Sequence, residues 1–502
     1  MITRFVVKGK CHYSLWWYFK IIIPLAPGQG RGYNAFQMDS DKAYQETLDY
    51  LYSFIDYSLQ KTFRYSPEKF DLDRMRSFMT ALGNPEREYP IIHVAGTKGK
   101  GSVSALCASA LQASGYQVGL YTSPHLQDFG ERIQVDGKPI SQGDLVALVE
   151  EIKPHVAASP EITTFEITTA LAFLYFARRK VNAAVVEVGL GGRLDATNVC
   201  HPLVTVITSV SYDHTYLLGE TLAEIAGEKA GIIKSGIPVV VSPQEEEAAE
   251  VIERIAAERK ADLVQVGKDY LFEPLSRSLQ DQTLKVWHKF EGSPIEGVKT
   301  LGEKTELDPA YLTVPLLGSH QVENAATAYA TLQVTHENGL EVSQEGIQQG
   351  FQSVVWPGRF EILHHDPPVI IDSAHNRDSA QKLRLTLQDY YPGHPLVLVF
   401  GASEDKDIQG MFAELLPLAR QLVATKSTHP RAIDPDELVE MAAQFDCPAI
   451  SSSSVEEALA AAELKADGEA ITLVTGSIFV AAAARAVWQE RYIEKDLSYT
   501  GN

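Results

Sequence analysis

The sequence has few cysteines and a deficit of positive charge. Only four cysteines occur among 502 residues, and they are widely separated, at Cys11, Cys107, Cys200 and Cys447. No two have the spacing of a disulfide framework or a zinc site, which favours a reducing cytoplasm. Lysine and arginine number 44 against 65 for aspartate and glutamate, a formal net charge of -21. A surface this acidic repels a phosphate backbone, so we expect no nucleic-acid partner.

A long hydrophobic run is also missing. The bulky apolar stretch over residues 15–25 is interrupted by Lys20 and is too short to span a bilayer, so we expect no membrane association. Its basic flank and apolar core also fit a signal peptide, although no small-residue cleavage site follows cleanly. A strongly helical pattern opens at Met38. We therefore interpret residues 1–37 as an extension outside the fold, with a targeting segment as the alternative.

The order of apolar segments predicts two α/β domains. A helical pattern covers residues 40–82, and after it short Val- and Ile-rich runs alternate with helical segments. Such runs are typical of buried parallel strands in a doubly wound sheet. The predicted strands are 91–95, 118–122, 183–188, 203–210 and 238–242 in a domain over residues 38–352, and 369–372, 396–400, 422–425 and 471–475 in a smaller Rossmann-like domain over residues 353–502. Alternating residues within 261–317 indicate a small antiparallel insert.

A loop rich in glycine and lysine follows the first predicted strand. It consists of Gly96, Thr97, Lys98, Gly99, Lys100, Gly101 and Ser102, and a helix is predicted from there to residue 113. Glycines let backbone N–H groups approach phosphate oxygens, the helix N-terminus adds positive potential, and Lys100 reaches the terminal phosphates. The loop therefore predicts ATP binding in a P-loop ATPase-type domain. Because glycine follows Lys100, a magnesium ligand has to come from Ser102 or from elsewhere.

Polar residues follow three further strands of the first domain. Ser123 comes after the second strand, Glu187 ends the third, and His214 follows the fourth. Ligands of open parallel sheets bind beyond the carboxyl ends of the strands. A carboxylate and an imidazole there are candidate ligands for magnesium, although histidine is uncommon for so hard a cation, and His214 alone fits a structural histidine equally well. Glu187 follows a buried apolar run, so we expect it to have a partner.

The second half of the chain offers three more candidate positions. A helix predicted over residues 322–334 has His320 and Asn324 before and within its first turn, on one face. Arg359 follows a Trp-Pro-Gly turn, and its planar guanidinium suits phosphate binding, although taken alone it fits a surface arginine better. Asp372 and His375 lie at the end of another predicted strand, facing the cleft expected between the domains.

Together these segments resemble the folylpolyglutamate synthase/dihydrofolate synthase family of the Mur ligase superfamily. The resemblance spans nearly all of residues 38–491 and is carried by G-T-x-G-K-G-S, E-V-G-L-G-G-R-L-D-A-T-N, S-x-D-H-x-x-x-L-G and G-E-K-A-G-I-I-K. It implies an ATP-dependent carbon–nitrogen ligase that adds L-glutamate to dihydropteroate, to tetrahydrofolate polyglutamates, or to both. The reaction implied passes through an acyl phosphate and releases ADP and phosphate.

The resemblance also implies roles for residues. Ser123 and Glu187 would bind one magnesium ion, and Glu187 with His214 a second. Lys229 matches a lysine that is carbamylated in the superfamily, although from its sequence context Lys234 would serve equally well. The residues implied in catalysis are Lys100, Glu187, His214, Lys229 and Arg359, and those implied at ATP beyond the loop are Asn324 at adenine, Arg359 at the phosphates, Asp372 at ribose and His375 nearby.

The resemblance also implies residues that bind the pterin and the glutamate. Phe129, Arg132 and Phe165 resemble the pterin-site region, and Ser477 resembles a residue of the glutamate site. Two positions depart from the usual family pattern: Lys98 stands where many bacterial members have asparagine, and Ser373 replaces a glycine. The family-based expectation is a cytoplasmic monomer.

Three other functions are consistent with parts of this pattern. A Mur ligase acting on cell-wall precursors would share the fold and the chemistry. An enzyme that forms an adenylate would release AMP and pyrophosphate, and a nucleotide-dependent switch would need no amine acceptor. The absence of any Ser–His–Asp or Cys–His arrangement in the sequence agrees with a mechanism that needs no side-chain nucleophile.

Overall fold

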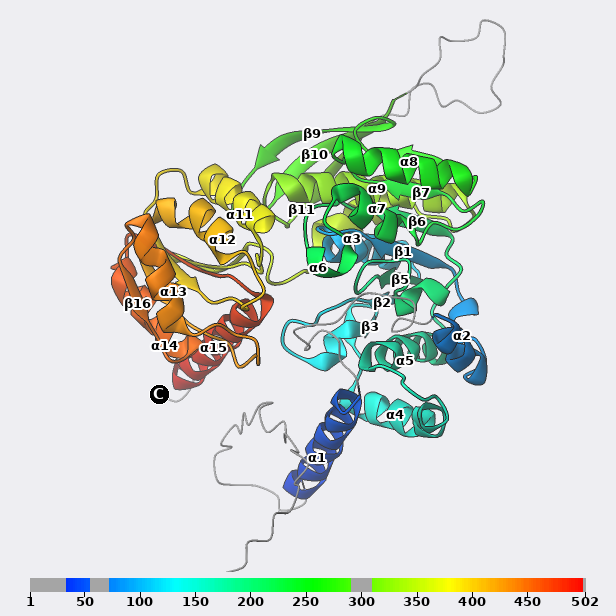
Figure 1. The fold of residues 1–502 in the computed structure, drawn as a ribbon, viewed down its shortest axis with the longest axis horizontal. Coiled ribbons are helices and arrows are strands. Elements are labelled where there is room, and N and C mark those ends of the chain that lie inside the picture. Colours follow the sequence, from blue (N-terminus) through cyan, green and yellow to red (C-terminus); the bar gives the residue numbers. More distant parts are fainter. Residues whose placement is uncertain (1–32, 55–71, 290–308, 500–502) are drawn as a thin grey trace, which may run out of the picture.

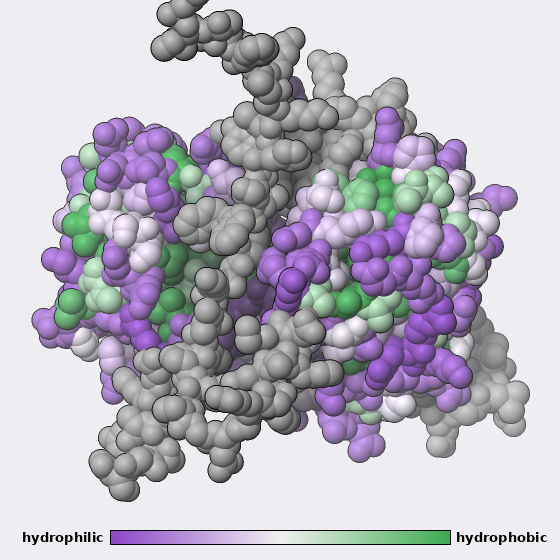
Figure 2. Space-filling view, turned by 90° about the horizontal axis from the view of Figure 1, so that it is seen from below, coloured by the Kyte–Doolittle hydropathy of each residue, from purple (hydrophilic) through white to green (hydrophobic). Residues whose placement is uncertain are grey.

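The computed structural model describes residues 33–54, 72–289 and 309–499, which form two α/β domains joined by the segment after α10 (Gln344–Ser353). In Figure 1 the first domain lies on the right and the second, coloured yellow to red, on the left. The predicted fold class is confirmed. Within the described residues no helix is both long and apolar enough to cross a membrane. Hydrophilic residues cover much of the face of both domains that Figure 2 shows.

The first domain is built on an eight-stranded sheet with the order β4-β3-β2-β5-β1-β6-β7-β8. Strands β2, β5, β1, β6, β7 and β8 are parallel, and β3 and β4 extend one edge in antiparallel pairs. The bounds are β1 (Ile91–Ala95), β2 (Val118–Tyr121), β3 (Ile133–Val135), β4 (Lys138–Pro139), β5 (Ala183–Glu187), β6 (Val204–Ile207), β7 (Val239–Val241) and β8 (Leu263–Gln265). All five strands predicted for this domain are present.

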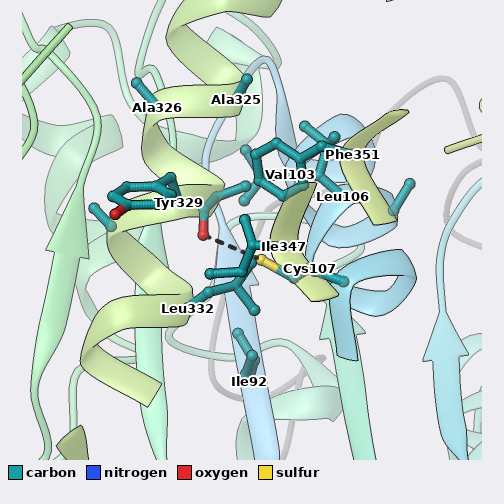
Figure 3. Close-up of a cluster of buried hydrophobic side chains, with 14 of the residues drawn as sticks. Ile92, Val103, Leu106, Cys107, Ala325, Ala326, Tyr329, Leu332, Ile347 and Phe351 are labelled. Atoms are coloured by element: carbon teal, nitrogen blue, oxygen red, sulfur yellow. Dashed lines mark hydrogen bonds between the residues drawn. The ribbon is translucent and has the colours of Figure 1, made fainter. Parts of the chain in front are cut away.

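Helices cover both faces of this sheet because its strands direct apolar side chains to both sides. Ile92 of β1 packs with α3 (Lys100–Ala113), α9 (Ser319–Glu337) and α10, and Figure 3 shows Cys107 of α3 in the same cluster. Ile91 faces the other side, where it packs with α1 (Tyr33–Tyr52), α2 (Leu72–Ala81), α4 (Gln142–Ala157) and α5 (Thr164–Arg179). Beside β6 and β7 lie α7 (Leu222–Ala230) and α8 (Glu246–Glu258).

The N-terminal helical stretch differs in detail from the expectation. The pattern predicted over residues 40–82 corresponds to α1 and α2, and residues 55–71 between them lie outside the described residues. Helix α1 begins at Tyr33, so the domain boundary proposed at residue 38 falls inside a helix. Residues 1–32 of the proposed extension also lie outside the described residues.

The antiparallel insert is present but starts later than expected. Strands β9 (Tyr270–Arg277), β10 (Gln282–His288) and β11 (Ala310–Val314) form an antiparallel sheet with the order β11-β10-β9. The alternation has a direct cause: Leu284 and Val286 are fully buried in the core beside α9, whereas Lys285 between them is not. Residues 263–265 instead form β8, because they extend the parallel sheet beside β7.

The second domain is a six-stranded sheet with the order β12-β13-β17-β14-β15-β16, parallel except for β12. Its strands are β12 (Glu361–His365), β13 (Pro368–Ile371), β14 (Leu396–Phe400), β15 (Ala419–Ala424), β16 (Ala449–Ser451) and β17 (Ile471–Thr475). Helices α11 (Arg377–Tyr390), α12 (Ile408–Leu415) and α13 (Pro435–Ala442) cover one face. On the other face lie α14 (Val455–Ala466) and α15 (Ile478–Tyr499).

Candidate active site

A cleft between the two domains collects the carboxyl ends of strands from both sheets. Its lining includes the whole phosphate loop, Ser123, Glu187, His214, Lys229 and Asn324 from the first domain, and Arg359, Asp372 and His375 from the chain beyond α10. Every residue predicted for ATP or magnesium therefore lies at one cavity. The sheet order explains this, because β2, β5, β1 and β6 are adjacent and parallel, so the residues that follow them meet at one edge.

The phosphate loop packs so closely on its neighbours at two glycines that neither position has room for a side chain. Gly96 has φ +147°, and a Cβ there would lie 1.8 Å from Thr208 Oγ1. Gly99 has φ +88°, and its Cβ would lie 2.2 Å from Asn324 Oδ1. The N–H groups of Thr97 and Lys98 both donate to the carbonyl of Ser209. The first N–H groups of α3 have no acceptor within that helix, so they are available to an anion.

Glu187 has the partner that its burial requires. It is 5% exposed, and Oε2 accepts the N–H of Ser123 at 3.1 Å. Burial raises the pKa of its carboxyl, while Lys100, the Ser123 N–H and Arg359 oppose that shift. The carboxylate thus lies between cations of both domains. These cations favour the charged form of the buried carboxylate, and the same surroundings suit a metal ion that arrives with a phosphate.

The structure separates two lysines that the sequence did not distinguish. Lys229 on α7 lines the cleft, is 4% exposed and donates to the carbonyl of Gly96 at 2.9 Å. Burial, assisted by the charge of Lys100, lowers its pKa to about 7. Lys234 lies outside the cleft lining and donates to Asn198 Oδ1 at 2.6 Å. The Lys229 amine is therefore more readily neutral than that of an exposed lysine.

Asp213 was not among the predicted site residues, yet it connects the two domains. Its Oδ2 accepts from Lys98 Nζ at 2.9 Å and from Asn376 Nδ2 at 3.2 Å, and it lies 3.6 Å from His375 Nε2. Lys406 Nζ is 3.7 Å from Oδ1. Although burial alone would raise it, the charge and hydrogen bond of the Lys98 ammonium hold the pKa of the Asp213 carboxyl well below its usual range. The available signal was its place before His214 in the S-x-D-H motif.

His375 has a definite hydrogen-bonding arrangement. Lys98 Nζ lies 3.2 Å from Nε2, and Nδ1 lies 2.9 Å from the carbonyl of Ser373. An ammonium can only donate, so Nε2 accepts and Nδ1–H donates, which assigns the neutral tautomer. The charge of Lys98 and burial both lower the pKa of His375. Burial also lowers the pKa of His214 to about 4, which leaves a neutral imidazole able to bind a metal.

The remaining residues predicted at ATP are fixed by local hydrogen bonds. Asn324 is 6% exposed and donates from Nδ2 to Gln321 Oε1 at 2.9 Å. Asp372 accepts the N–H groups of Phe360 and Ala374, each at 2.8 Å. Ser373 is not among the residues with positive φ, so the position usually held by glycine does not require one in this chain.

The residues predicted at the pterin and glutamate sites lie outside the lining of this cleft. Phe129 is buried with its ring centroid 6.1 Å from that of Tyr52, and Arg132 Nε donates to His125 Nδ1 at 2.9 Å. Phe165 packs on Gly189, whose Cβ would lie 2.3 Å from its ring. Ser477 accepts the N–H of Val480 at 3.2 Å, at the start of α15. Their roles at substrate stay predictions.

Comparison with known proteins agrees with this architecture. Residues 94–332 match the Mur ligase middle domain, and residues 358–478 match the Mur ligase glutamate ligase domain. With the phosphate loop and the cleft between the domains, these matches define an ATP-dependent acid–amino-acid ligase.

Individual relatives indicate which family of acid–amino-acid ligases the chain resembles. The chain is 38% identical over 450 residues to the dihydrofolate synthase/folylpolyglutamate synthase of Bacillus subtilis, covering 87% of this chain and 97% of that protein. Mycobacterium tuberculosis folylpolyglutamate synthase complexed with ADP superposes with a TM-score of 0.79 at 33% identity, covering 89% of this chain and 99% of that one. A folylpolyglutamate synthase complex with AMPPCP and folate gives 0.73 at 32% identity, covering 88% and 98%. The chain belongs to the dihydrofolate synthase/folylpolyglutamate synthase family.

Proposed function

We propose that this enzyme joins L-glutamate to a pterin- or folate-type carboxylate at the interdomain cleft, at the expense of ATP. One observation carries the proposal: the phosphate loop of one domain and Arg359, Asp372 and His375 from the other half of the chain line a single cavity around the buried Glu187. The relatives named for folylpolyglutamate and dihydrofolate synthesis favour this substrate class over cell-wall precursors.

The reaction has two balanced steps. A carboxylate oxygen of the substrate attacks the γ-phosphorus of ATP, the bond to the β,γ-bridging oxygen breaks, and ADP leaves. The deprotonated α-amine of glutamate then attacks the carbonyl carbon of the acyl phosphate. The C–O bond to phosphate breaks, the nitrogen loses a further proton, and the amide and inorganic phosphate are the products. Most of the rate enhancement then comes from alignment and charge stabilisation.

Each half of the cleft contributes to that alignment. The N–H groups at the start of α3 and the Lys100 ammonium would hold the phosphates of ATP, with Arg359 facing them from the second domain. Asn324 would contact adenine and Asp372 the ribose, while His375 and Lys98, 3.2 Å apart, would lie near the phosphates. Phe129, Arg132 and Phe165 would contact the pterin, and Ser477 the incoming glutamate.

Magnesium would enter with ATP, and the residues present fit it. Glu187 offers a buried carboxylate, Ser123 a hydroxyl and His214 a neutral imidazole. Among the described residues no group of three or more His, Cys, Asp or Glu forms a complete metal site. That agrees with an ion that takes its remaining ligands from phosphate and water. When bound, magnesium would neutralise charge on the transferring phosphoryl group.

We also propose that Lys229 is carbamylated. A neutral amine reacts with CO₂ and an ammonium does not, and the burial that lowers the pKa of Lys229 to about 7 supplies the neutral form. The carbamate would place an anion near Lys100 and Lys98, the lysines whose charges act on this amine. Its charge would then orient the groups that bind magnesium.

The first experiment follows ADP release by the purified chain with Mg-ATP, L-glutamate, and either dihydropteroate or tetrahydrofolate. We expect ADP only when glutamate and one pterin substrate are both present, and the preferred pterin settles the specificity. AMP as the product would overturn the acyl phosphate mechanism. If neither dihydropteroate nor tetrahydrofolate supports ADP release, the proposed substrate class is refuted.

A variant tests the role of the phosphate loop in the same assay. Lys100→Ala should lower the rate by about 10²–10³-fold, because it removes a preorganised charge from the phosphates. Lys138→Ala, at an exposed position on β4, is the control and should keep full activity. A folded Lys100→Ala protein with near-normal activity would contradict the assignment.

We propose that the enzyme works as a cytoplasmic monomer on small molecules and without a nucleic-acid partner. The acidic sequence supports the absence of a nucleic-acid partner, the scattered cysteines support a reducing cytoplasm, and the monomer is the expectation from the family. Light scattering at micromolar concentration should give the mass of one chain. A mass of two chains would refute the monomer.

A further inference from the structure

Arg359 lies in a turn whose backbone is left-handed on both sides of it. Gly358 has φ +73° and Phe360 has φ +46°. The second value is costly for a residue with a side chain and persists only where the surroundings hold it. Two carboxylates do so: Asp372 Oδ2 accepts the N–H of Phe360 at 2.8 Å, and Glu361 Oε2 accepts the N–H of Gly358 at 2.7 Å.

Glu361 is itself held by an arginine much later in the chain. Arg485 on α15 donates from Nε to both carboxylate oxygens of Glu361, at 2.9 and 3.1 Å. The two side chains are 20% and 23% exposed, so solvent screens the pair only partly. Charged hydrogen bonds of this kind fix the rotamer of a carboxylate. The orientation of Glu361 towards Gly358 therefore depends on Arg485.

Arg485 also touches the first domain. Its Nη1 donates to Gln127 Oε1 at 2.7 Å, and Gln127 belongs to the segment that follows Ser123. The backbone N–H of Gln127 is held in turn by Glu131 at 3.1 Å. Arg485 thus contacts the Arg359 turn and an anchored segment of the opposite domain at the same time, although it does not line the cleft.

We propose that Arg485 is a positioning residue for Arg359 and acts on it through Glu361. The inference rests on the proposed role of Arg359 at the ATP phosphates. Without Arg485, Glu361 is free to turn towards water, the N–H of Gly358 loses its acceptor, and the turn relaxes from its strained conformation. A displacement of about 1 Å at a positioned charge lowers catalysis by up to about 10²-fold. Loss of Arg485 should therefore reduce the use of ATP without removing any group that touches it.

The test compares Arg485→Ala and Glu361→Gln with a control on the same helix. Arg491 on α15 pairs with Glu463 at 2.9 Å, and these side chains are 33% and 34% exposed. Arg485→Ala and Glu361→Gln should each lower kcat/KM for ATP by about tenfold. That loss lies within the range of coupling energies measured between charged neighbours. Arg491→Ala should leave kcat/KM unchanged, and all three should have similar unfolding midpoints in urea.

Double variants distinguish positioning from a general structural effect. If Arg485 acts through Arg359, then Arg359→Ala/Arg485→Ala should have a kcat/KM within about twofold of Arg359→Ala alone. A further tenfold loss in the double variant would overturn the proposal. Should Arg485→Ala not fold, Glu361→Gln in the Arg359→Ala background makes the same comparison. Full activity of Arg359→Ala would instead refute the role assigned to Arg359, and a wild-type enzyme without glutamate-dependent ADP release would refute the function itself.

Discussion

At the scale of single residues, Lys229 and Lys234 show how surroundings separate two identical side chains. Both lie in one G-E-K-A-G-I-I-K motif, but only Lys229 lines the cleft and has a pKa of about 7. The sequence could not distinguish them, because the difference lies in which amine is enclosed by Lys98, Lys100 and Gly96.

The carbamate proposed at Lys229 predicts a dependence of activity on pH and CO₂. Activity should fall in CO₂-depleted buffer, because the carbamate is lost. Bicarbonate should restore activity only above about pH 7, because below that pH the amine becomes an ammonium, which does not react with CO₂. Lys229→Ala should lose about 10²-fold in rate, as other removals of a positioned charge do, and should recover in part with added acetate. Lys234→Ala serves as the control and should gain nothing from acetate. The same outcome for both variants would contradict the assignment.

His93 predicts a specific loss of stability in acid. It is completely buried in β1 with Nε2 2.8 Å from Thr197 Oγ1, and burial lowers its pKa from 6.5 to about 3. Between those values the unfolded chain binds one more proton than the folded one, so stability falls as pH falls, by about 1.4 kcal/mol per pH unit. Urea unfolding between pH 6.5 and pH 4 should be less pH-dependent for His93→Asn than for the exposed-site control His201→Asn. Equal slopes would refute the effect.

At the scale of elements, the strands were the most predictable part of the molecule. β1, β14 and β17 have the predicted bounds, because continuous Val- and Ile-rich runs belong to strands buried on both faces. β4, β12 and β16 were missed because they are edge strands whose residues are half-buried or exposed, and β3 because it has only three residues. Their pairing is set by neighbours and not by their own pattern.

The contact between the phosphate loop and α9 leads to a prediction with a close control. Gly99 and Gly83 have φ of +88° and +89°, but a Cβ at Gly83 meets nothing within 4 Å, whereas one at Gly99 meets Asn324. Gly83→Ala should cost only the backbone strain, about 1 kcal/mol. Gly99→Ala should cost about 1–3 kcal/mol more and should lower ATP affinity, since the loop has to move. Asn324→Ala in the same chain should recover part of the stability. Equal costs at both glycines, measured by urea unfolding, would contradict this.

At the scale of the whole molecule, the position of one domain on the other could not be read from the sequence. Strand-end residues were predictable, because parallel strands bring their carboxyl ends to one edge. The contacts of Asp213 with Asn376, His375 and Lys406 were not, because they exist only once the second domain is in place.

Asp213→Asn tests whether this cluster holds the domains together. The substitution keeps the shape but removes the charge that faces Lys98, His375 and Lys406. Without nucleotide the variant should have a larger radius of gyration by X-ray scattering, and a non-hydrolysable ATP analogue should reverse the change. Glu414→Gln is the control, because Glu414 is similarly buried and pairs with Arg384 at 3.0 Å within one domain. Glu414→Gln should lower stability by about 3 kcal/mol without expansion. An unchanged radius for Asp213→Asn would refute the interdomain role.

The place of β17 in the second sheet has a consequence for how the enzyme is made. β17 is the last strand among the described residues, yet it lies in the middle of the sheet, between β13 and β14. A ribosome releases residues 368–371 and 396–400 well before residues 471–475, and a chain emerging N-terminus first folds domain by domain. The strand that presents Asp372 therefore has one side unpaired until residues 471–475 have been synthesised. The first domain can assemble early, but the ability to use ATP comes only once β17 has been made, and nascent chains stalled before it present an open sheet edge to chaperones.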